Sequence, residues 1–200
     1  MRLSLNKNAL KQQRDHLAMY RRFLPSLDLK RKQLLKAQKE AQLQLAGLQT
    51  EIQTFQQSAQ RLLPTLGSST IDPAQLSGLV RVHNVVMDEE NVVGVHLPAI
   101  VEIEIVRAEY SRLTLPFWID QLADYLEQIA RLRIQLQVSK ARVDLLSAAA
   151  RKITQRVNLF EKILIPQAES NIKRIGIALS DQERAAVVRS KLAKRKRQSS

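Results

Sequence analysis

Apolar residues recur along the first third of the chain with alternating spacings of three and four. This first ladder starts at Leu10 and runs to Leu62, and thirteen of its sixteen positions are apolar. The polar exceptions are Gln13, Arg31 and Gln38. These polar positions either fix the register of a helix pair or are loosely packed. A seam that repeats every 3.5 residues over seven heptads is typical of a coiled coil, so residues 1–63 are predicted to form one helical arm.

A second ladder begins at Trp118 and continues to Leu164, with Ser139 as its one polar position. Two long arms with matching seams, joined by a shorter insert, predict a mainly α fold: a long antiparallel intramolecular coiled coil. The second arm is expected at residues 117–200. A dimer formed through each arm separately is a less economical alternative, because folding back makes the partner helix local.

Two prolines lie inside these ladders. The seam keeps its phase across Pro25, which favours a kinked helix over two separate helices. At Pro166 the seam moves from Leu164 to Ala168, so two spacings of four follow one another. Because an interior proline costs about 3 kcal/mol, we expect a local change of supercoil here. Residues 180–183 resemble a capping box that could restart a last helix, although a continuous arm is favoured.

The insert at residues 64–116 has a different pattern. It opens with a break rich in helix-stopping residues, and residues 72–76 could form a short helical turn. The β-like runs that follow lie at residues 79–86, 92–97 and 100–106. A polar turn is expected at residues 88–91, and Pro98 is expected to interrupt the strands. The pattern predicts a small β-hairpin or a three-stranded flap that leans on the coil or on a partner.

The formal net charge is +13, and it is unevenly spread because two basic arms flank an acidic insert. Basic arms suit nucleic acid or anionic lipid, and they equally suit an acidic protein cavity. The absence of cysteine excludes disulfides and thiolate metal sites. No apolar run is long enough to span a bilayer, and the N-terminal sequence has no signal-peptide pattern.

The sequence offers little for catalysis. The basic tail has no glycines, so it forms no phosphate-binding loop. His16, His83 and His96 lie on different predicted elements, and the adjacent carboxylates at 88–90 suit a solvated turn better than an acid–base pair. The chain is therefore predicted to be non-catalytic, with no cofactor and no metal.

Four ordered blocks carry a resemblance to a known family. The strongest is residues 156–175, which contain Arg-Val-Asn, then Ile-Pro, then Asn-Ile. The other blocks are residues 8–10 with 29–35, residues 91–98 with an Asn-x-x-Gly-Val turn and a following proline, and residues 116–120. Together they resemble the D subunits of V/A-type rotary ATPases. Gln155 and residues 183–188 depart from the family pattern.

The resemblance implies a central rotor shaft, a non-catalytic component of an ion-translocating rotary ATPase. Its rotation would couple ATP synthesis or hydrolysis to proton or sodium transport. The implied partners are the A and B subunits of the catalytic hexamer, the F subunit of the rotor and the adaptor of the membrane ring, with no direct nucleotide and no nucleic acid. The implied location is cytoplasmic, peripheral to the membrane. The alternative is a basic coiled-coil adaptor, or a nucleic-acid-binding protein anchored by Lys194–Arg197.

On this hypothesis three sets of residues carry the function. The expected hexamer contacts are basic: Arg151, Lys152, Arg156, Lys162, Lys173, Arg174, Lys191 and Lys194. The expected flap residues are Asn91, Gly94 and Pro98. The expected seam-packing residues are Val157, Phe160 and Leu164.

Overall fold

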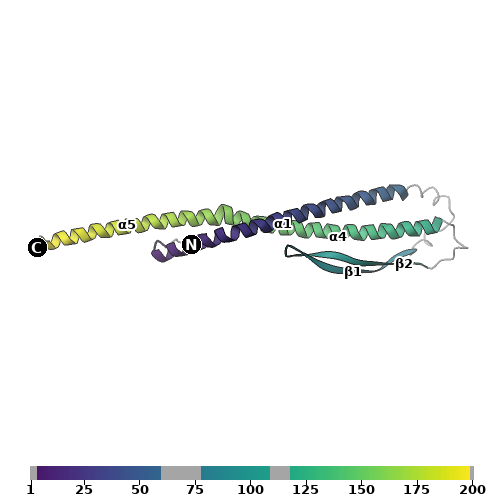
Figure 1. Ribbon diagram of the computed structural model, residues 1–200, viewed down its shortest axis with the longest axis horizontal. Coiled ribbons are helices and arrows are strands. Elements are labelled where there is room, and N and C mark those ends of the chain that lie inside the picture. Colours follow the sequence, from purple (N-terminus) through teal and green to yellow (C-terminus); the bar gives the residue numbers. More distant parts are fainter. Residues whose placement is uncertain (1–3, 60–77, 109–117, 199–200) are drawn as a thin grey trace. The chain divides into compact units, whose positions relative to one another are not determined.

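The structure is a computed structural model that describes residues 4–59, 78–108 and 118–198. Its elements are α1 (Lys7–Ala59), β1 (Val80–Val92), β2 (Val95–Arg107), α4 (Trp118–Leu159), the π-helical turn η1 (Phe160–Leu164) and α5 (Ile165–Gln198) (Figure 1). This order confirms the mainly α fold with a β-hairpin between two long helical arms. The break at 64–70 and the turn at 72–76 lie outside the described residues.

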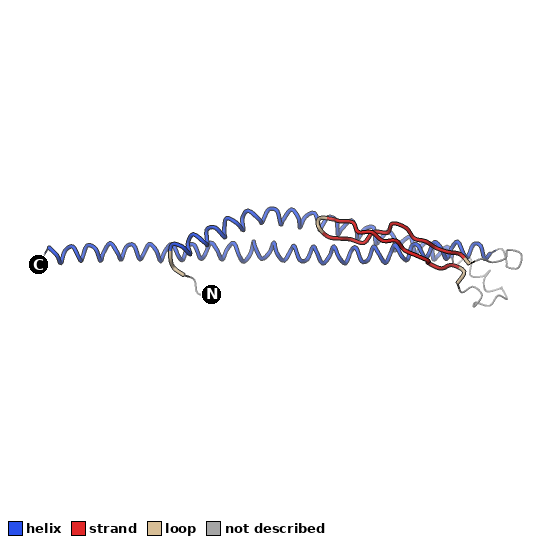
Figure 2. The backbone as a smooth tube through the Cα atoms, turned by 90° about the horizontal axis from the view of Figure 1, so that it is seen from below, coloured by secondary structure: helices blue, strands red, loops and turns tan. Residues whose placement is uncertain are grey.

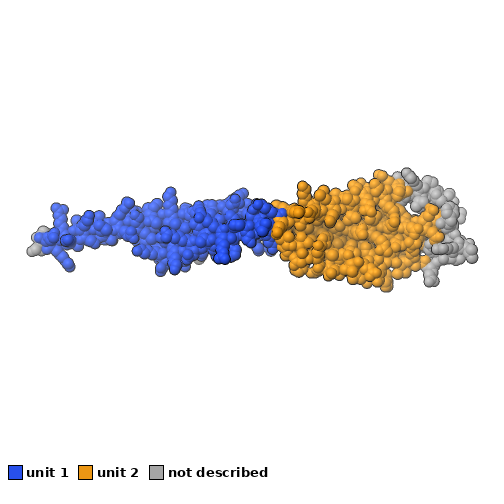
Figure 3. Space-filling view, viewed as in Figure 1, with its two compact units in different colours: residues 1–32, 151–200 blue, residues 33–150 orange. Residues whose placement is uncertain are grey.

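The chain forms two compact units (Figure 3). Unit 1 comprises Met1–Lys32 with Arg151–Ser200, and unit 2 comprises Gln33–Ala150. Both α1 and α4 therefore contribute residues to each unit. The division into an N-terminal arm, an insert and a C-terminal arm remains a prediction.

In unit 1 the first part of α1 runs antiparallel to α5. Asn171 Nδ2 donates to Gln13 Oε1 at 3.2 Å, and Arg21 Nη2 donates to Glu169 Oε1 at 2.6 Å. Lower-numbered residues of α1 thus face higher-numbered residues of α5, as antiparallel helices require. The buried apolar residues of this unit are Ile153, Val157, Ala168 and Ile175.

Unit 2 contains a second antiparallel helix pair and the hairpin. Gln38 Nε2 donates to Ser147 Oγ at 3.0 Å, and the rings of Phe55 and Tyr125 stack with centroids 4.8 Å apart. The helix-pair core contains Leu34, Ala41, Ile52, Ile129, Leu146 and Ala150. A separate cluster closes the base of the hairpin with Leu79, Trp118, Ile119 and Ala123. Figure 2 shows the hairpin in red beside the blue helices.

Every seam position whose burial the structure describes is buried or half-buried, which confirms both ladders. Two of the polar seam residues, Gln13 and Gln38, make the hydrogen bonds across the helix pair given above. Arg31 instead pairs with Asp28 on its own helix at 2.5 Å. Cross-helix pairing of this kind supports the register role for the two glutamines rather than loose packing.

The hairpin corrects the predicted turn and strand limits. Two strands of 13 residues replace three short runs, and residues 88–91 lie within β1 rather than in a turn. The chain reverses at Val93 and Gly94, both with positive φ, as a two-residue hairpin turn requires. Pro98 does not interrupt the sheet. Pro98 lies in β2, opposite Glu89 of β1. The sheet tolerates this proline because both strands of a two-stranded sheet are edge strands, which accept a missing backbone N–H.

The helical arms pass through both prolines. Pro25 lies inside the continuous helix α1, so the alternative of two separate helices is wrong. Likewise α5 runs unbroken through residues 180–183, and no helix restarts there. At the second proline the helix changes locally to the π-helical turn η1, in which the Ile165 N–H donates to the Phe160 carbonyl.

Candidate interaction surfaces

The π-helical turn explains the departure of the seam from its heptad. A π-bulge accommodates one extra residue in a helix. The ladder gains one extra residue by Ala168, and η1 at Phe160–Leu164 supplies it two residues before Pro166. As a result, Ala168 and Ile175 return to the buried side at 3% and 0% exposure. The sequence predicted that the proline and the phase shift are one feature, and the structure adds the π-bulge beside them.

The three predicted seam-packing residues lie beside this feature. Val157 is 1% exposed, and Phe160 and Leu164 are half-buried. The Phe160 ring meets the Tyr20 ring edge-on, with centroids 5.4 Å apart. All three side chains therefore lie on the helix-pair side of α4 and η1.

The eight predicted hexamer-contact residues all lie in unit 1 and are all exposed. They are distributed over α4 (Arg151, Lys152, Arg156), η1 (Lys162) and α5 (Lys173, Arg174, Lys191, Lys194). None of the eight makes an ion pair with a carboxylate among the described residues. Their charges are thus available to solvent or to a partner.

The end of α5 is exposed on every side. Residues 181–198 are all exposed and carry seven basic and two acidic side chains. Near the start of this stretch Glu183 lies 3.9 Å from Lys7, the first residue of α1. Beyond that point no described residue of unit 1 covers α5. Val187, Val188 and Leu192, each 55% exposed, add apolar side chains that the ladder did not predict.

The predicted flap residues form the closed end of the hairpin. The Gly94 N–H donates to Asn91 Oδ1 at 2.8 Å, and Gly94 has a φ of 78°. Val93 precedes it with a φ of 55°, an unfavourable conformation for a β-branched residue. Only the Asn-x-x-Gly signal in the sequence located this turn correctly.

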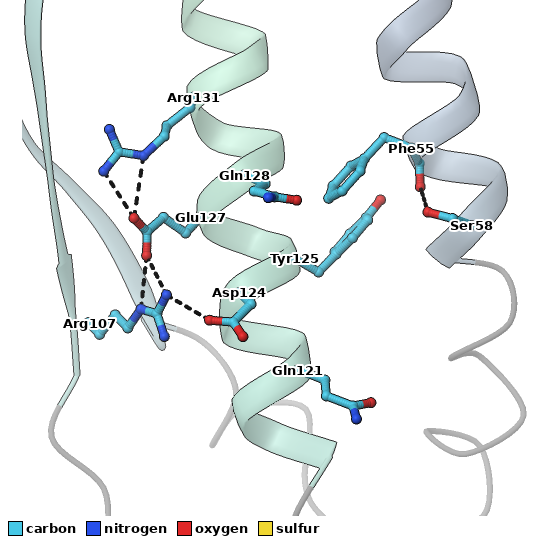
Figure 4. Close-up of a pocket in the computed structure, with 9 residues that line it drawn as sticks. All are labelled: Phe55, Ser58, Arg107, Gln121, Asp124, Tyr125, Glu127, Gln128 and Arg131. Atoms are coloured by element: carbon cyan, nitrogen blue, oxygen red, sulfur yellow. Dashed lines mark hydrogen bonds and ion pairs between the residues drawn. The ribbon is translucent and has the colours of Figure 1, made fainter.

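Arginine and glutamate side chains join the base of the hairpin to α4 (Figure 4). Arg107 of β2 lies 2.7 Å from Asp124 and 2.6 Å from Glu127, and Arg131 lies 2.9 Å from Glu127. The hydrogen bonds from Arg107, and then those from Arg131, hold the pKa of Glu127 below its ordinary value. The same hydrogen bonds to Glu127 and Asp124 raise the pKa of Arg107. Glu127 therefore stays ionised and bridges strand and helix.

A second arginine of α4 holds the other end of the hairpin. Arg142 Nη1 donates to the Pro98 carbonyl at 3.0 Å, and its Nη2 donates to Glu90 Oε2 at 2.6 Å. One guanidinium thus reaches both strands. Sequence reasoning missed Arg107, Arg131 and Arg142, although the eleven-residue spacing of the last two places them on one face of a helix.

The described residues contain no cluster of three or more side chains suited to a metal ion, and no described helix is long and apolar enough to cross a membrane. Glu89 and His96 face each other across the hairpin at 3.3 Å, and both are well exposed. The structure therefore offers exposed helix and strand surfaces. These features define a protein of two long helical arms that pair with each other and are joined in sequence by a β-hairpin.

Comparison with known proteins narrows this class to one family. The family model described as the D subunit of ATP synthase matches residues 9–195. The V-type ATP synthase D subunit of Borreliella burgdorferi is 34% identical over 196 residues, which cover 96% of this chain and 94% of that protein. The protein of the same name from Chlamydia trachomatis serovar L2 is 32% identical, covering 97% and 95%. The chain belongs to the family of ATP synthase D subunits.

Proposed function

We propose that the chain is the central rotor shaft of a V/A-type ATPase or ATP synthase and is itself non-catalytic. Its rotation would couple ATP synthesis or hydrolysis in a catalytic hexamer of A and B subunits to proton or sodium transport. Family membership supports a place in such a complex. The complex would place the chain on the cytoplasmic side, peripheral to the membrane.

The observation that carries the shaft role is the uncovered basic end of α5 on a seam-packed helix pair. A shaft needs resistance to twisting, which the interlocked seam of an antiparallel pair supplies. It also needs an end that turns inside its partners without interlocking. Exposed lysines and arginines at residues 181–198 suit an acidic sleeve, because charge attraction centres the helix without deep apolar contacts.

We assign the eight predicted hexamer-contact residues, all exposed basic side chains of unit 1, to the catalytic hexamer. The hairpin is assigned to the F subunit of the rotor and to the membrane-ring adaptor. Its exposed valines and methionine support this second assignment: Val82, Val86, Met87, Val101 and Val106 are each at least 38% exposed. Exposed apolar residues gathered on one short element are typical of protein contact sites.

Co-expression with the catalytic subunits and the F subunit tests the proposal. We expect a complex that purifies as one species and hydrolyses ATP with coupled rotation. The double variant Lys191→Glu/Lys194→Glu should weaken assembly with the hexamer, and the matched variant Lys36→Glu/Lys39→Glu, on exposed residues of unit 2, should leave it unchanged. Failure of the wild-type chain to purify with these proteins, together with DNA binding at physiological salt, would show that the nucleic-acid alternative is correct.

A further inference from the structure

Strand β2 is fastened to helix α4 at two separate carbonyl groups. Arg131 Nη1 donates to the Ile103 carbonyl at 3.1 Å, and Arg142 Nη1 donates to the Pro98 carbonyl at 3.0 Å. The higher-numbered helix residue holds the lower-numbered strand residue, so β2 runs antiparallel to α4. Both fastenings lie within unit 2.

The spacings of the two elements match. Eleven helical residues separate the arginines, which is about three turns and a rise of about 16.5 Å. Five strand residues separate Pro98 from Ile103, which is also about 16.5 Å. Because eleven residues return a side chain to the same face, both guanidinium groups leave α4 toward the strand at the separation of the two carbonyls.

Each fastening contains more than one bond. In addition, Arg131 Nη2 donates to Glu127 Oε1 at 2.9 Å, and Arg142 Nη2 donates to Glu90 Oε2 of β1 at 2.6 Å. Buried apolar side chains lie at the same two places, since Leu97 is 1% and Ile103 is 9% exposed. A planar guanidinium reaches two acceptors at once, which an ammonium group does not do with the same geometry.

We propose that Arg131 and Arg142 act as two clasps, through which the hairpin stiffens α4 against twisting. At the base of the hairpin β2 is also joined to α4 by Arg107, which binds Asp124 and Glu127, and the two clasps extend this attachment along the strand. Two fastenings about three turns apart oppose twisting, because rotation of α4 beneath β2 pulls at least one guanidinium away from its carbonyl. Helix α4 and the hairpin of unit 2 then resist twisting as one body. This role concerns unit 2 alone and does not depend on the rotor assignment.

Amide hydrogen exchange on the purified full chain tests the clasps. In Arg131→Ala/Arg142→Ala we expect amides of the β1–β2 ladder to exchange about tenfold faster, while amides of unit 1 keep their rates. Arg142→Ala alone should affect chiefly residues 88–99, and Arg131→Ala alone chiefly residues 102–107. The control is Arg133→Ala, since Arg133 is exposed on α4 and makes no hydrogen bond or ion pair with another described residue. Equal hairpin exchange in the double variant and the control would overturn the proposal.

Two further measurements keep the test decisive if the double variant folds poorly. Arg142→Lys retains the charge and should still accelerate exchange at residues 88–99 severalfold, whereas wild-type rates would show that the two-armed clasp is not needed. Since the chain has no cysteine, nitroxide labels at Lys39→Cys and Lys140→Cys report the α1–α4 distance within unit 2. The clasp variants should broaden that distance distribution. An unchanged width would overturn the torsional role.

Discussion

Units 1 and 2 rest on the same pattern of antiparallel helices but bury different amounts of apolar side chain. Among the described residues, unit 1 buries four apolar residues and unit 2 buries twelve. The helix pair of unit 2 holds six of those twelve residues, against four in unit 1, so the seam accounts for only a small part of the difference. The hairpin accounts for the rest, because it covers α4 and closes a separate cluster around Trp118. A two-helix seam specifies pairing, and a third element is needed to enclose a core.

The polar contacts of the two units also differ in how exposed their side chains are. In unit 1 Arg21 and Glu169 pair through side chains that are 63% and 47% exposed, and such surface pairs stabilise little. In unit 2 arginines bind backbone carbonyls and Glu127, whose side chain is 21% exposed. Unit 1 should therefore depend almost wholly on its seam, and unit 2 should tolerate the loss of a single contact better.

The largest effect is expected from a charge placed in the seam of unit 1. Val157→Asp buries a carboxylate that has no partner, which should lower the free energy of unfolding by about 3–5 kcal/mol. Urea unfolding followed by circular dichroism measures this loss, and in the assembled complex the variant should abolish coupled turnover. Leu159→Asp is the matched control, because Leu159 is 42% exposed two residues further on. Similar losses in both variants would contradict the seam assignment.

A change of similar size is expected when the π-bulge is removed without removing its proline. Deleting exposed Gln167 restores alternating spacings of three and four after Leu164, but it forces Pro166 into a regular α-helix. That conflict should cost about 3 kcal/mol. In a Pro166→Ala background the same deletion should cost little, because the regular helix then fits the seam. Denaturant unfolding compares the loss of unfolding free energy in the two deletion variants. Equal losses would show that the proline does not cause the bulge.

The elements that the sequence predicted well are those with a long repeated period. Both ladders extend over many turns, so a local irregularity at Pro25 or Pro166 could not hide them. The turn at Val93–Gly94 is set by two residues only, and the acidic run at 88–90 resembled a turn more strongly in composition. Those carboxylates lie in a strand because an exposed edge strand of a two-stranded sheet accepts polar side chains.

The clasps could not be predicted from the sequence. The eleven-residue spacing between Arg131 and Arg142 shows only that the two arginines share a helix face. Their acceptors are backbone carbonyls, which every strand residue possesses. The pairing depends on strand register, which the two β-bulges near His83 and Val101 shift. The basic residues of unit 1 are the opposite case. Their exposure follows directly from their positions off the seam, whereas their partners lie outside the chain.

A moderate gain is expected at the hairpin turn. Val93 holds a φ of 55°, which a β-branched side chain disfavours and asparagine accepts. Val93→Asn should therefore stabilise the hairpin by about 1 kcal/mol, seen as slower amide exchange at the β1–β2 ladder. The variant Val106→Asn changes an exposed strand valine to the same residue and should give no gain. Slower exchange in both variants would mean that the turn conformation is not the cause.

The smallest effect concerns the Glu127 carboxylate that joins Arg107 to Arg131. Its pKa is lowered in the folded chain, so its stabilising contribution is present above its ordinary pKa of 4.5 and is lost as the pH falls through the folded value. At pH 7 Glu127→Gln should therefore be less stable than the wild type by about 0.5–1 kcal/mol, and the gap should close in acid. Glu169→Gln in unit 1 removes a more exposed partner and should show a smaller gap at pH 7. Unfolding curves across this pH range separate charge from packing, because a Glu127→Gln gap that persists in acid would come from side-chain shape and not from the ion pair.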